Sequence, residues 1–109
     1  MQTYDATLAK ARPAARILVS DVAAATARHF GLAPSELRMH TRRLPIVTAR
    51  MIAMHLACKH TKASTPQIGR LLGDFDHSTV LNARDRIAKR ADLAADVAAV
   101  EAALLAVQA

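Results

Sequence analysis

The apolar positions along the chain recur with helical spacing. In residues 46–60 they fall three or four positions apart, and no segment alternates apolar and polar residues with the period of a strand. Only three glycines and four prolines interrupt these patterns. The chain is therefore predicted to be all-α, with a long helix over residues 46–60. The buried stripe of that helix is expected to comprise Ala49, Ile52, Ala53, Leu56 and Ala57.

Two shorter elements are predicted ahead of the long helix. Ser20 and Asp21 form a suitable N-cap for a helix that reaches about Phe30 and stops at Gly31. Residues 34–37 begin with a proline, which favours a short helical turn because the missing N–H costs little at that position.

A helix-turn-helix arrangement is predicted over residues 64–90. Ser64 and Gln67 have the spacing of a capping box, in which each side chain bonds the backbone N–H of the other residue. The short helix that follows stops at Gly73 and carries three apolar residues, Ile68, Leu71 and Leu72. Asp76 then caps a second helix with a further apolar face, Val80, Ala83 and Ile87. Two short helices joined by a tight turn define this motif.

The two ends of the chain flank a domain predicted over residues 17–91. Residues 1–16 form either a short helix or a loose arm, since Pro13 breaks whatever precedes it. Residues 92–109 are rich in alanine and are expected to continue as an amphipathic helix. Its apolar stripe comprises Leu93, Val97, Val100 and Leu104. That helix either packs on the domain or pairs with a partner, and packing is favoured because a small domain needs every apolar face it has.

Charge changes the picture because it is unevenly distributed. The chain carries 15 Lys and Arg against 9 Asp and Glu, a net charge of +6, and its pI is about 10.5. Residues 37–73 contain no acid and hold the whole excess of basic residues. Those bases are Arg38, Arg42, Arg43, Arg50, Lys59, Lys62 and Arg70. A solvated face is the ordinary explanation, but the length of the acid-free block favours a surface that faces phosphates, with nucleic acid as the partner.

Other classes of protein are disfavoured. Apolar residues make up 52% of the chain, enough for one core, although aromatic residues make up only 3%. Cys58 is the single cysteine, so no internal disulfide can form and a reducing cytoplasm is the simplest compartment. No run of about 18 apolar residues and no signal peptide is present. The histidines lack metal-ligand spacing and no motif places a nucleophile beside a base, so no metal, cofactor or enzymatic activity is expected.

The most informative stretch is residues 73–80, Gly-Asp-Phe-Asp-His-Ser-Thr-Val. It places short polar side chains at the N-terminus of the second helix, the end that enters the major groove in a helix-turn-helix. Asp76 can accept a hydrogen bond from a cytosine amino group, and His77 and Ser78 can exchange hydrogen bonds with base edges. The helix N-terminus adds free N–H groups for a nearby phosphate.

This octet resembles the signature of domain IV, the C-terminal DNA-binding domain of the bacterial replication initiator DnaA, which runs Gly-Gly-Arg-Asp-His-Thr-Thr-Val or close to it. The resemblance covers about residues 18–90 without gaps. It includes His29-Phe30-Gly31-Leu32, Ser35-Glu36-Leu37, Arg42-Arg43, Ala53-Met54, Leu56-Ala57 and Pro66-Gln67-Ile68-Gly69. The Pro-x-Ile-Gly segment followed by Asp-His-Ser-Thr-Val makes the resemblance specific.

The resemblance implies a set of DNA-binding positions. The major groove would be contacted through Asp76, His77, Ser78 and Thr79. Arg42 would enter the adjacent minor groove, which A·T-rich sequence narrows and makes more negative. Thr65 and Pro66 would lie where the first helix of the motif crosses the backbone, and Arg50 matches a basic position of the long helix. The remaining predicted DNA-binding residues are Arg43, Lys59, Lys62, Gln67 and Phe75.

Departures from the family pattern suggest the same docking mode on a related but different DNA sequence. Phe75 replaces a basic residue, so one phosphate contact is lost or exchanged for an apolar contact. Cys58 stands where the family commonly has lysine, and Ser78 lacks the threonine methyl that could touch a thymine methyl. The chain contains no Gly-x-x-x-x-Gly-Lys-Ser/Thr motif of the family's ATPase module. We therefore expect no bound nucleotide, and a DNA-reading domain used alone or cut from something longer.

The leading hypothesis is a sequence-specific double-stranded DNA-binding protein that regulates transcription, most simply an activator, in the cytoplasm on the nucleoid. The resemblance extends to phage-type and gene-transfer-agent activators. RNA polymerase or another regulator would be contacted through the C-terminal helix or the N-terminal arm. Two alternatives stay open: a replication-initiation regulator that binds DnaA-box-like sites, and a helical protein-interaction module that has lost DNA reading.

Overall fold

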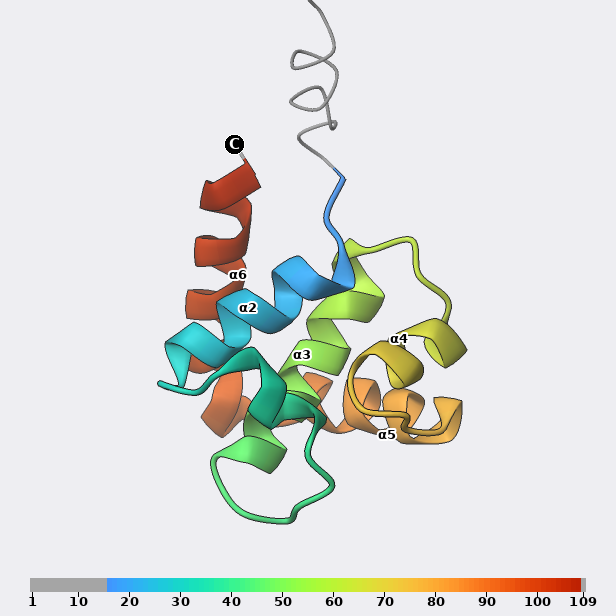
Figure 1. Ribbon diagram of the computed structural model, residues 1–109. Helices are drawn as coiled ribbons and strands as arrows, with labels where there is room; N and C mark the ends of the chain where they lie inside the picture. Colours follow the sequence, from blue (N-terminus) through green and yellow to red (C-terminus); the bar gives the residue numbers. More distant parts are fainter. Residues whose placement is uncertain (1–15, 109) are drawn as a thin grey trace, which may run out of the picture.

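The structure, a computed structural model, describes residues 16–108, and these are helical apart from their connecting turns. The elements are α2 (Val19–His29), the 3-10 helix η1 (Pro34–Arg38), α3 (Ile46–His60), α4 (Thr65–Leu71), α5 (His77–Ala88), the 3-10 turn η2 (Ala91–Leu93) and α6 (Ala94–Gln108) (Figure 1). The all-α prediction is confirmed. The possible arm or helix at the N-terminus lies outside the described residues. Among residues 16–108, no helix is both long and apolar enough to span a membrane.

Helix α3 forms the centre of the fold. In Figure 1, α2 crosses over it, α6 lies on one side, and α4 and α5 lie on the other. Every member of the stripe predicted for this helix is inaccessible to solvent. Ile46 and Met54 are buried as well, and so is Arg50. The helix is therefore enclosed on more sides than one stripe requires, which is why its surroundings, and not its own pattern, determine which of its residues reach solvent.

The start of α2 differs from the prediction, whereas its end agrees. The helix begins at Val19, so that Leu18 and not Ser20 occupies the N-cap position. Asp21 lies inside the first turn, and its Oδ2 accepts a hydrogen bond from the Leu18 N–H at 2.8 Å. An acidic residue near the start of a helix thus satisfies a backbone donor without being the N-cap residue. Gly31 ends the helix with a φ of 71°, a left-handed conformation that glycine adopts at little cost.

The C-terminal helix packs on the domain. Val100 and Leu104 of α6 are buried, and the helix contacts α2 and α3. Two polar contacts add to this apolar seam. The Asp96 carboxylate of α6 lies 2.9 Å from Nε2 of His29, and Oε2 of Glu101 lies 2.7 Å from Nζ of Lys59 and 2.5 Å from Nε2 of His60. Because the apolar stripe of α6 faces the domain, that stripe is not available to a partner.

The turn of the helix-turn-helix passes so close to α4 that position 69 must be glycine. Gly69 is buried in α4, and a Cβ added there would lie 2.0 Å from the backbone oxygen of Phe75. The Phe75 N–H in turn donates to the Gly69 carbonyl at 2.9 Å. Ile68 and Leu72 of the first helix are buried, whereas Leu71, grouped with them by pattern, is 56% exposed. The predicted apolar face of α5, formed by Val80, Ala83 and Ile87, is buried.

Candidate nucleic-acid interface

The first turn of α5 presents a row of exposed polar side chains, His77, Ser78 and Thr79, directly after Asp76. Asp76 occupies the N-cap position, as predicted, but its side chain makes no capping hydrogen bond. Oδ2 accepts a hydrogen bond from the Ser78 hydroxyl at 2.6 Å, and Oδ1 lies 3.3 Å from Nδ1 of His77. The predicted N-cap position is therefore confirmed, although the carboxylate is engaged by the side chains of Ser78 and His77. The start of a helix favours an outside anion such as a phosphate.

Asp76 is held as an exposed anion. The hydroxyl of Ser78 is the main reason that the pKa of Asp76 is lowered, and the imidazole of His77 contributes in the same direction. The side chain is 69% exposed, and that of His77 is 57% exposed. An ionised carboxylate is an acceptor only, so this position suits a donor such as the amino group of cytosine.

A three-residue stack, here called the loop clamp, joins the helix-turn-helix to the loop before α3. Its members are His40, Phe75 and Arg50. The imidazole of His40 stacks on the Phe75 ring with centroids 4.2 Å apart and planes 13° apart. Nε2 of His40 also forms a hydrogen bond with the carbonyl oxygen of Gly73 in the turn. The chain ahead of α3 is thus fastened to the turn that precedes α5.

Arg50 is the third member of the loop clamp and contacts the Phe75 ring. Its guanidinium carbon lies 4.5 Å from the centroid of the Phe75 ring. Its Nη1 donates to the Met39 carbonyl at 2.8 Å, and its Nη2 donates to the Thr41 carbonyl at 3.4 Å. Only 9% of the residue is exposed, and burial lowers its pKa, although a guanidinium stays charged at neutral pH. The structure therefore places Arg50 beneath the loop, as its support, rather than on the surface where a phosphate would meet it.

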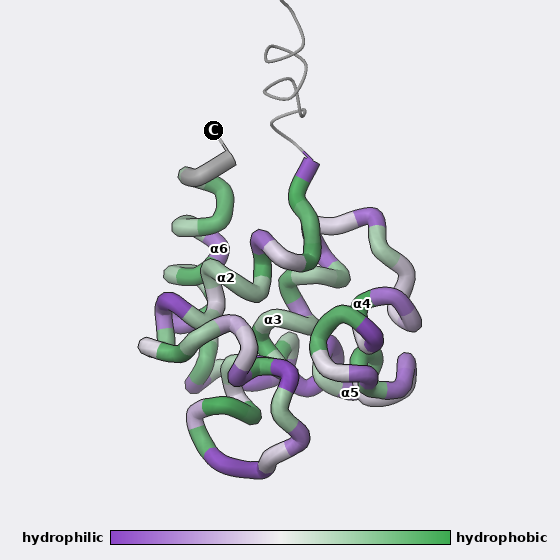
Figure 2. The backbone as a smooth tube through the Cα atoms, viewed as in Figure 1, coloured by the Kyte–Doolittle hydropathy of each residue, from purple (hydrophilic) through white to green (hydrophobic). Residues whose placement is uncertain are grey.

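The loop clamp brings together two sets of predicted contact residues. Arg42 and Arg43 belong to the loop, following His40 by two and three positions, and both are exposed. Asp76 follows Phe75 directly. The stacked pair therefore fixes the basic loop close to the start of α5. Figure 2 shows hydrophilic segments along this loop and around α4 and α5. We call residues 40–43 and 75–79 the recognition surface.

The remaining predicted residues fall at α4 and beside it. Ser64 and Gln67 form the predicted capping box: the Ser64 N–H donates to Oε1 of Gln67 at 2.8 Å, and the Gln67 N–H donates to Oγ of Ser64 at 3.3 Å. Thr65 and Pro66 form the first turn of the helix that this box starts. Lys59, Lys62 and Gln67 line a groove between the start of α2, the end of α3 and α4. None of the residues of the recognition surface lines that groove.

Two features of the site were absent from the sequence prediction. His40 had no assigned role, and Arg38 and Arg70 were assigned only to the acid-free block. A signal for the first existed: Phe75 is an aromatic residue among polar turn residues, and half-buried rings usually find a ring or cation partner. The spacing of the chain does not identify that partner, because His40 and Phe75 meet only through the tertiary fold.

Other chemistry finds little support in the described part of the chain. No group of three or more His, Cys, Asp or Glu side chains there could hold a metal ion. Cys58 is half-buried, and burial raises the pKa of its thiol, which disfavours the reactive thiolate.

Comparison with known proteins gives one family. The profile described as "Bacterial dnaA protein helix-turn-helix" matches residues 19–87, more than half of the chain. Among curated proteins, the chromosomal replication initiator protein DnaA of Thermus thermophilus is 44% identical over 66 residues, 61% of this chain and 15% of the relative. The DnaA protein of Caulobacter sp. (strain K31) is 44% identical over 78 residues, which are 71% of this chain and 16% of that relative. The DnaA protein of Agrobacterium fabrum is 42% identical over 74 residues, which are 68% of this chain and 15% of that relative. The chain thus spans about a sixth of the length of these relatives.

Proposed function

Because the chain belongs to the bacterial DnaA helix-turn-helix family of DNA-binding domains, we propose that it reads double-stranded DNA sequence-specifically, with the start of α5 in the major groove. The observation that carries this proposal is the exposed row from Asp76 to Thr79 at that helix start. These side chains are short, so base contact requires close approach of the helix to the groove floor. The start of a helix favours a negatively charged group, so a phosphate beside the first turn of α5 would support such an approach.

The basic loop is proposed to read the adjacent minor groove. Arg42 lies on the loop that the loop clamp ties to the turn before α5. An arginine inserted in a narrow minor groove senses its negative potential, which is strongest in A·T-rich sequence. Arg43 is proposed to contact phosphate without reading sequence. Thr65 and Pro66, at the start of α4, would meet the sugar-phosphate backbone of the duplex.

For the cellular role we propose transcription regulation by binding at promoters on the nucleoid. Duplex reading by the recognition surface is the activity that a regulator bound at a promoter requires. The alternative is control of replication initiation, and it is favoured by the name that the relatives share, chromosomal replication initiator protein. Both roles require the same recognition surface and differ in where the bound sites lie.

Selection from fragmented host genomic DNA tests both the sequence-specific reading of DNA and the proposed role in transcription. The purified protein would be incubated with the fragments at about 0.15 M salt, and the retained pool sequenced, because salt determines how much non-specific binding survives. We expect one enriched motif clustered at promoters. A motif clustered at the origin would replace the transcription role by the replication role. A flat pool would contradict sequence-specific reading and leave the interaction-module hypothesis.

A variant pair makes the selection interpretable. His77→Ala removes one side chain of the recognition surface, and Lys89→Ala removes an exposed side chain just beyond the opposite end of α5. The helix is 12 residues long, so the two ends lie about 18 Å apart. We expect loss of the enriched motif with His77→Ala and its retention with Lys89→Ala. Equal loss with both variants would indicate attraction by charge alone.

A further inference from the structure

A second surface, distinct from the recognition surface, lies where α2 begins and α4 faces it. We call it the basic groove. It has a volume of about 1140 Å³ and is lined by residues from the start of α2, the end of α3, the loop after it, α4 and one residue of η1. No residue of α5 or of residues 40–45 contributes to the lining. The residues proposed to read bases therefore lie outside the lining of this groove.

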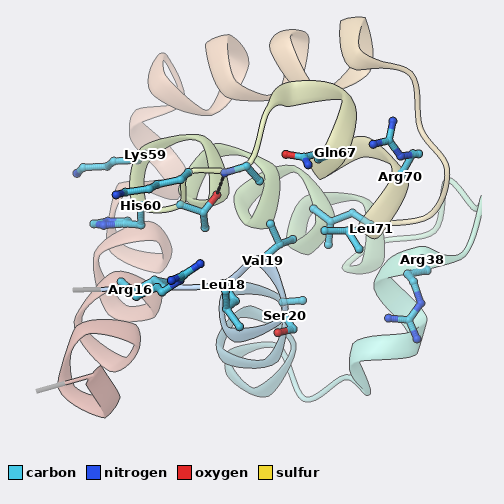
Figure 3. Close-up of a pocket in the computed structure, with 16 residues that line it drawn as sticks. Arg16, Leu18, Val19, Ser20, Arg38, Lys59, His60, Gln67, Arg70 and Leu71 are labelled. Carbon is cyan, nitrogen blue, oxygen red and sulfur yellow. Dashed lines mark hydrogen bonds between the residues drawn. The ribbon is translucent and has the colours of Figure 1, made fainter. Parts of the chain in front are cut away.

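The basic groove combines an apolar floor with a cationic rim. Figure 3 shows Leu18, Val19 and Leu71 in the middle, Arg38 and Arg70 at one end, and Arg16, Lys59 and His60 at the other. Leu18 is 42% exposed and Leu71 is 56% exposed, so two of the few large apolar side chains left in solvent lie here. No acidic residue lines the groove. An apolar centre with a polar rim is the arrangement of a protein–protein interface.

The two ends of the groove differ in how far their charges are compensated. Lys59 and His60 share the carboxylate of Glu101, so that end is partly neutralised by the domain itself. Arg38, Arg70 and Lys62 have no carboxylate within ion-pair distance among the described residues. A ligand that supplies carboxylates would thus be held chiefly at the end marked by Arg38 and Arg70.

We propose that the basic groove binds an acidic, amphipathic segment of a partner protein, with leucine-like side chains on Leu18 and Leu71 and carboxylates on Arg38, Lys62 and Arg70. Charge complementarity selects an acidic occupant, and the exposed leucines favour a peptide with apolar side chains over a nucleic-acid backbone, whose apolar surface is limited to its sugars. Residues 1–15 are a poor match, since they carry two bases and one acid.

The test is a titration of the ¹⁵N-labelled full chain with a synthetic peptide of about 14 residues. The probe carries leucine at positions i, i+3, i+4 and i+7 and glutamate at most other positions. A second probe keeps the glutamates and replaces every leucine by serine. We expect saturable shifts of amide signals from residues 16–20, 61–63 and 67–72 with the first probe. The second probe should bind at least tenfold more weakly.

Matched variants identify the surface. Arg70→Glu and Leu71→Ser change exposed positions of the groove, so the fold should survive, which a melting curve would verify. Arg86→Glu and Leu105→Ser are the controls, because both residues are exposed and neither lines the groove. We expect each groove variant to weaken the leucine probe at least tenfold and each control to leave its affinity unchanged. Binding of cognate duplex DNA should be retained by Leu71→Ser.

Four results would overturn the proposal. The first is an absence of shifts in the groove at millimolar probe. The second is equal binding of the serine probe, which would mean that charge alone attracts it. The third is a titration with duplex DNA that shifts the amide signals of the groove as strongly as the amide signals of α5, which would assign the groove to DNA. The fourth is a concentration-dependent shift without any probe, which would put a second copy of the chain in the groove. Failure of DNA reading in the genomic selection would leave the peptide result untouched, so the two proposals fail separately.

Discussion

The imidazole of His40 lies flat against the ring of Phe75, with 4.2 Å between their centroids, although 35 positions separate them in the chain. This contact joins the loop that carries Arg42 to the turn that carries Asp76. The residue that departs from the family signature is therefore used inside the molecule. Phe75 exchanges a possible phosphate contact for the fixing of a loop.

Removing the ring of Phe75 should release that loop. Phe75→Ala is expected to destabilise the fold by about 1–3 kcal/mol, since the ring is half-buried and stacked on two partners. Amide exchange in residues 40–43 should accelerate, and any preference for A·T pairs at the flank of the DNA site should weaken. Phe75→Tyr keeps the ring and serves as control. Unchanged exchange in the loop of the alanine variant would disprove the role of the loop clamp.

Arg50 should act by supporting the loop and not by neutralising phosphate. Arg50→Lys keeps the charge but loses the planar fork that reaches the carbonyls of Met39 and Thr41. We expect a loss of stability of about 1–2 kcal/mol and weaker DNA binding, with the slope of log K against log salt unchanged. A slope reduced by about one for Arg50→Ala would instead indicate a direct phosphate contact.

Asp76 should discriminate between DNA sequences, whereas Arg43 should not. Asp76→Ala removes an exposed acceptor at the start of α5, so binding to the selected motif should fall tenfold to about a hundredfold while binding to scrambled duplex stays the same. Arg43→Ala should weaken both duplexes alike and reduce the salt slope by about one. Fluorescence anisotropy on the two duplexes at several salt concentrations measures both effects. Equal losses on both duplexes for Asp76→Ala would exclude base reading by that residue.

Gly69 should be irreplaceable, for a steric reason. A methyl group at this position would lie 2.0 Å from the Phe75 carbonyl oxygen, so Gly69→Ala must push α4 away from the turn. Thermal unfolding should show a loss of about 2–4 kcal/mol. Gly31→Ala is the comparison: nothing lies within 4 Å of its Cβ position, and only the φ of 71° opposes the change, at about 1–2 kcal/mol. A milder effect at Gly69 than at Gly31 would contradict the packing of the turn.

Stability should depend on pH through Glu101, which ties α6 to α3. The ammonium group of Lys59, followed by His60, lowers the pKa of this carboxyl below its unfolded value of about 4.3. The stabilisation is therefore complete above that unfolded value and is lost as pH falls through the lowered pKa of the folded state. Glu101→Gln should reduce the melting temperature by a few degrees at pH 7, with the difference from the native chain shrinking toward pH 3. A difference constant with pH would assign the effect to packing alone.

Sequence patterns alone predicted the helices, the capping box and the polar row at the start of α5. These features depend on residues within about four positions of one another, where spacing and backbone chemistry determine the outcome. The apolar stripe of α3 was recovered for the same reason. The N-cap of α2 was misplaced because an acidic residue is favoured both at the N-cap and at N3, and Asp21 takes the N3 position, where it accepts from the Leu18 N–H.

Only the tertiary structure decided where each basic residue of the acid-free block lies. Arg50 is buried under the basic loop, Arg43 is exposed on it, and Arg70 lines a groove beside α2. The three share one chemistry and one stretch of chain, so no local pattern separates them. The position of each residue depends on which elements pack against it. Those elements meet through contacts such as that between His40 and Phe75, which only the folded chain brings together.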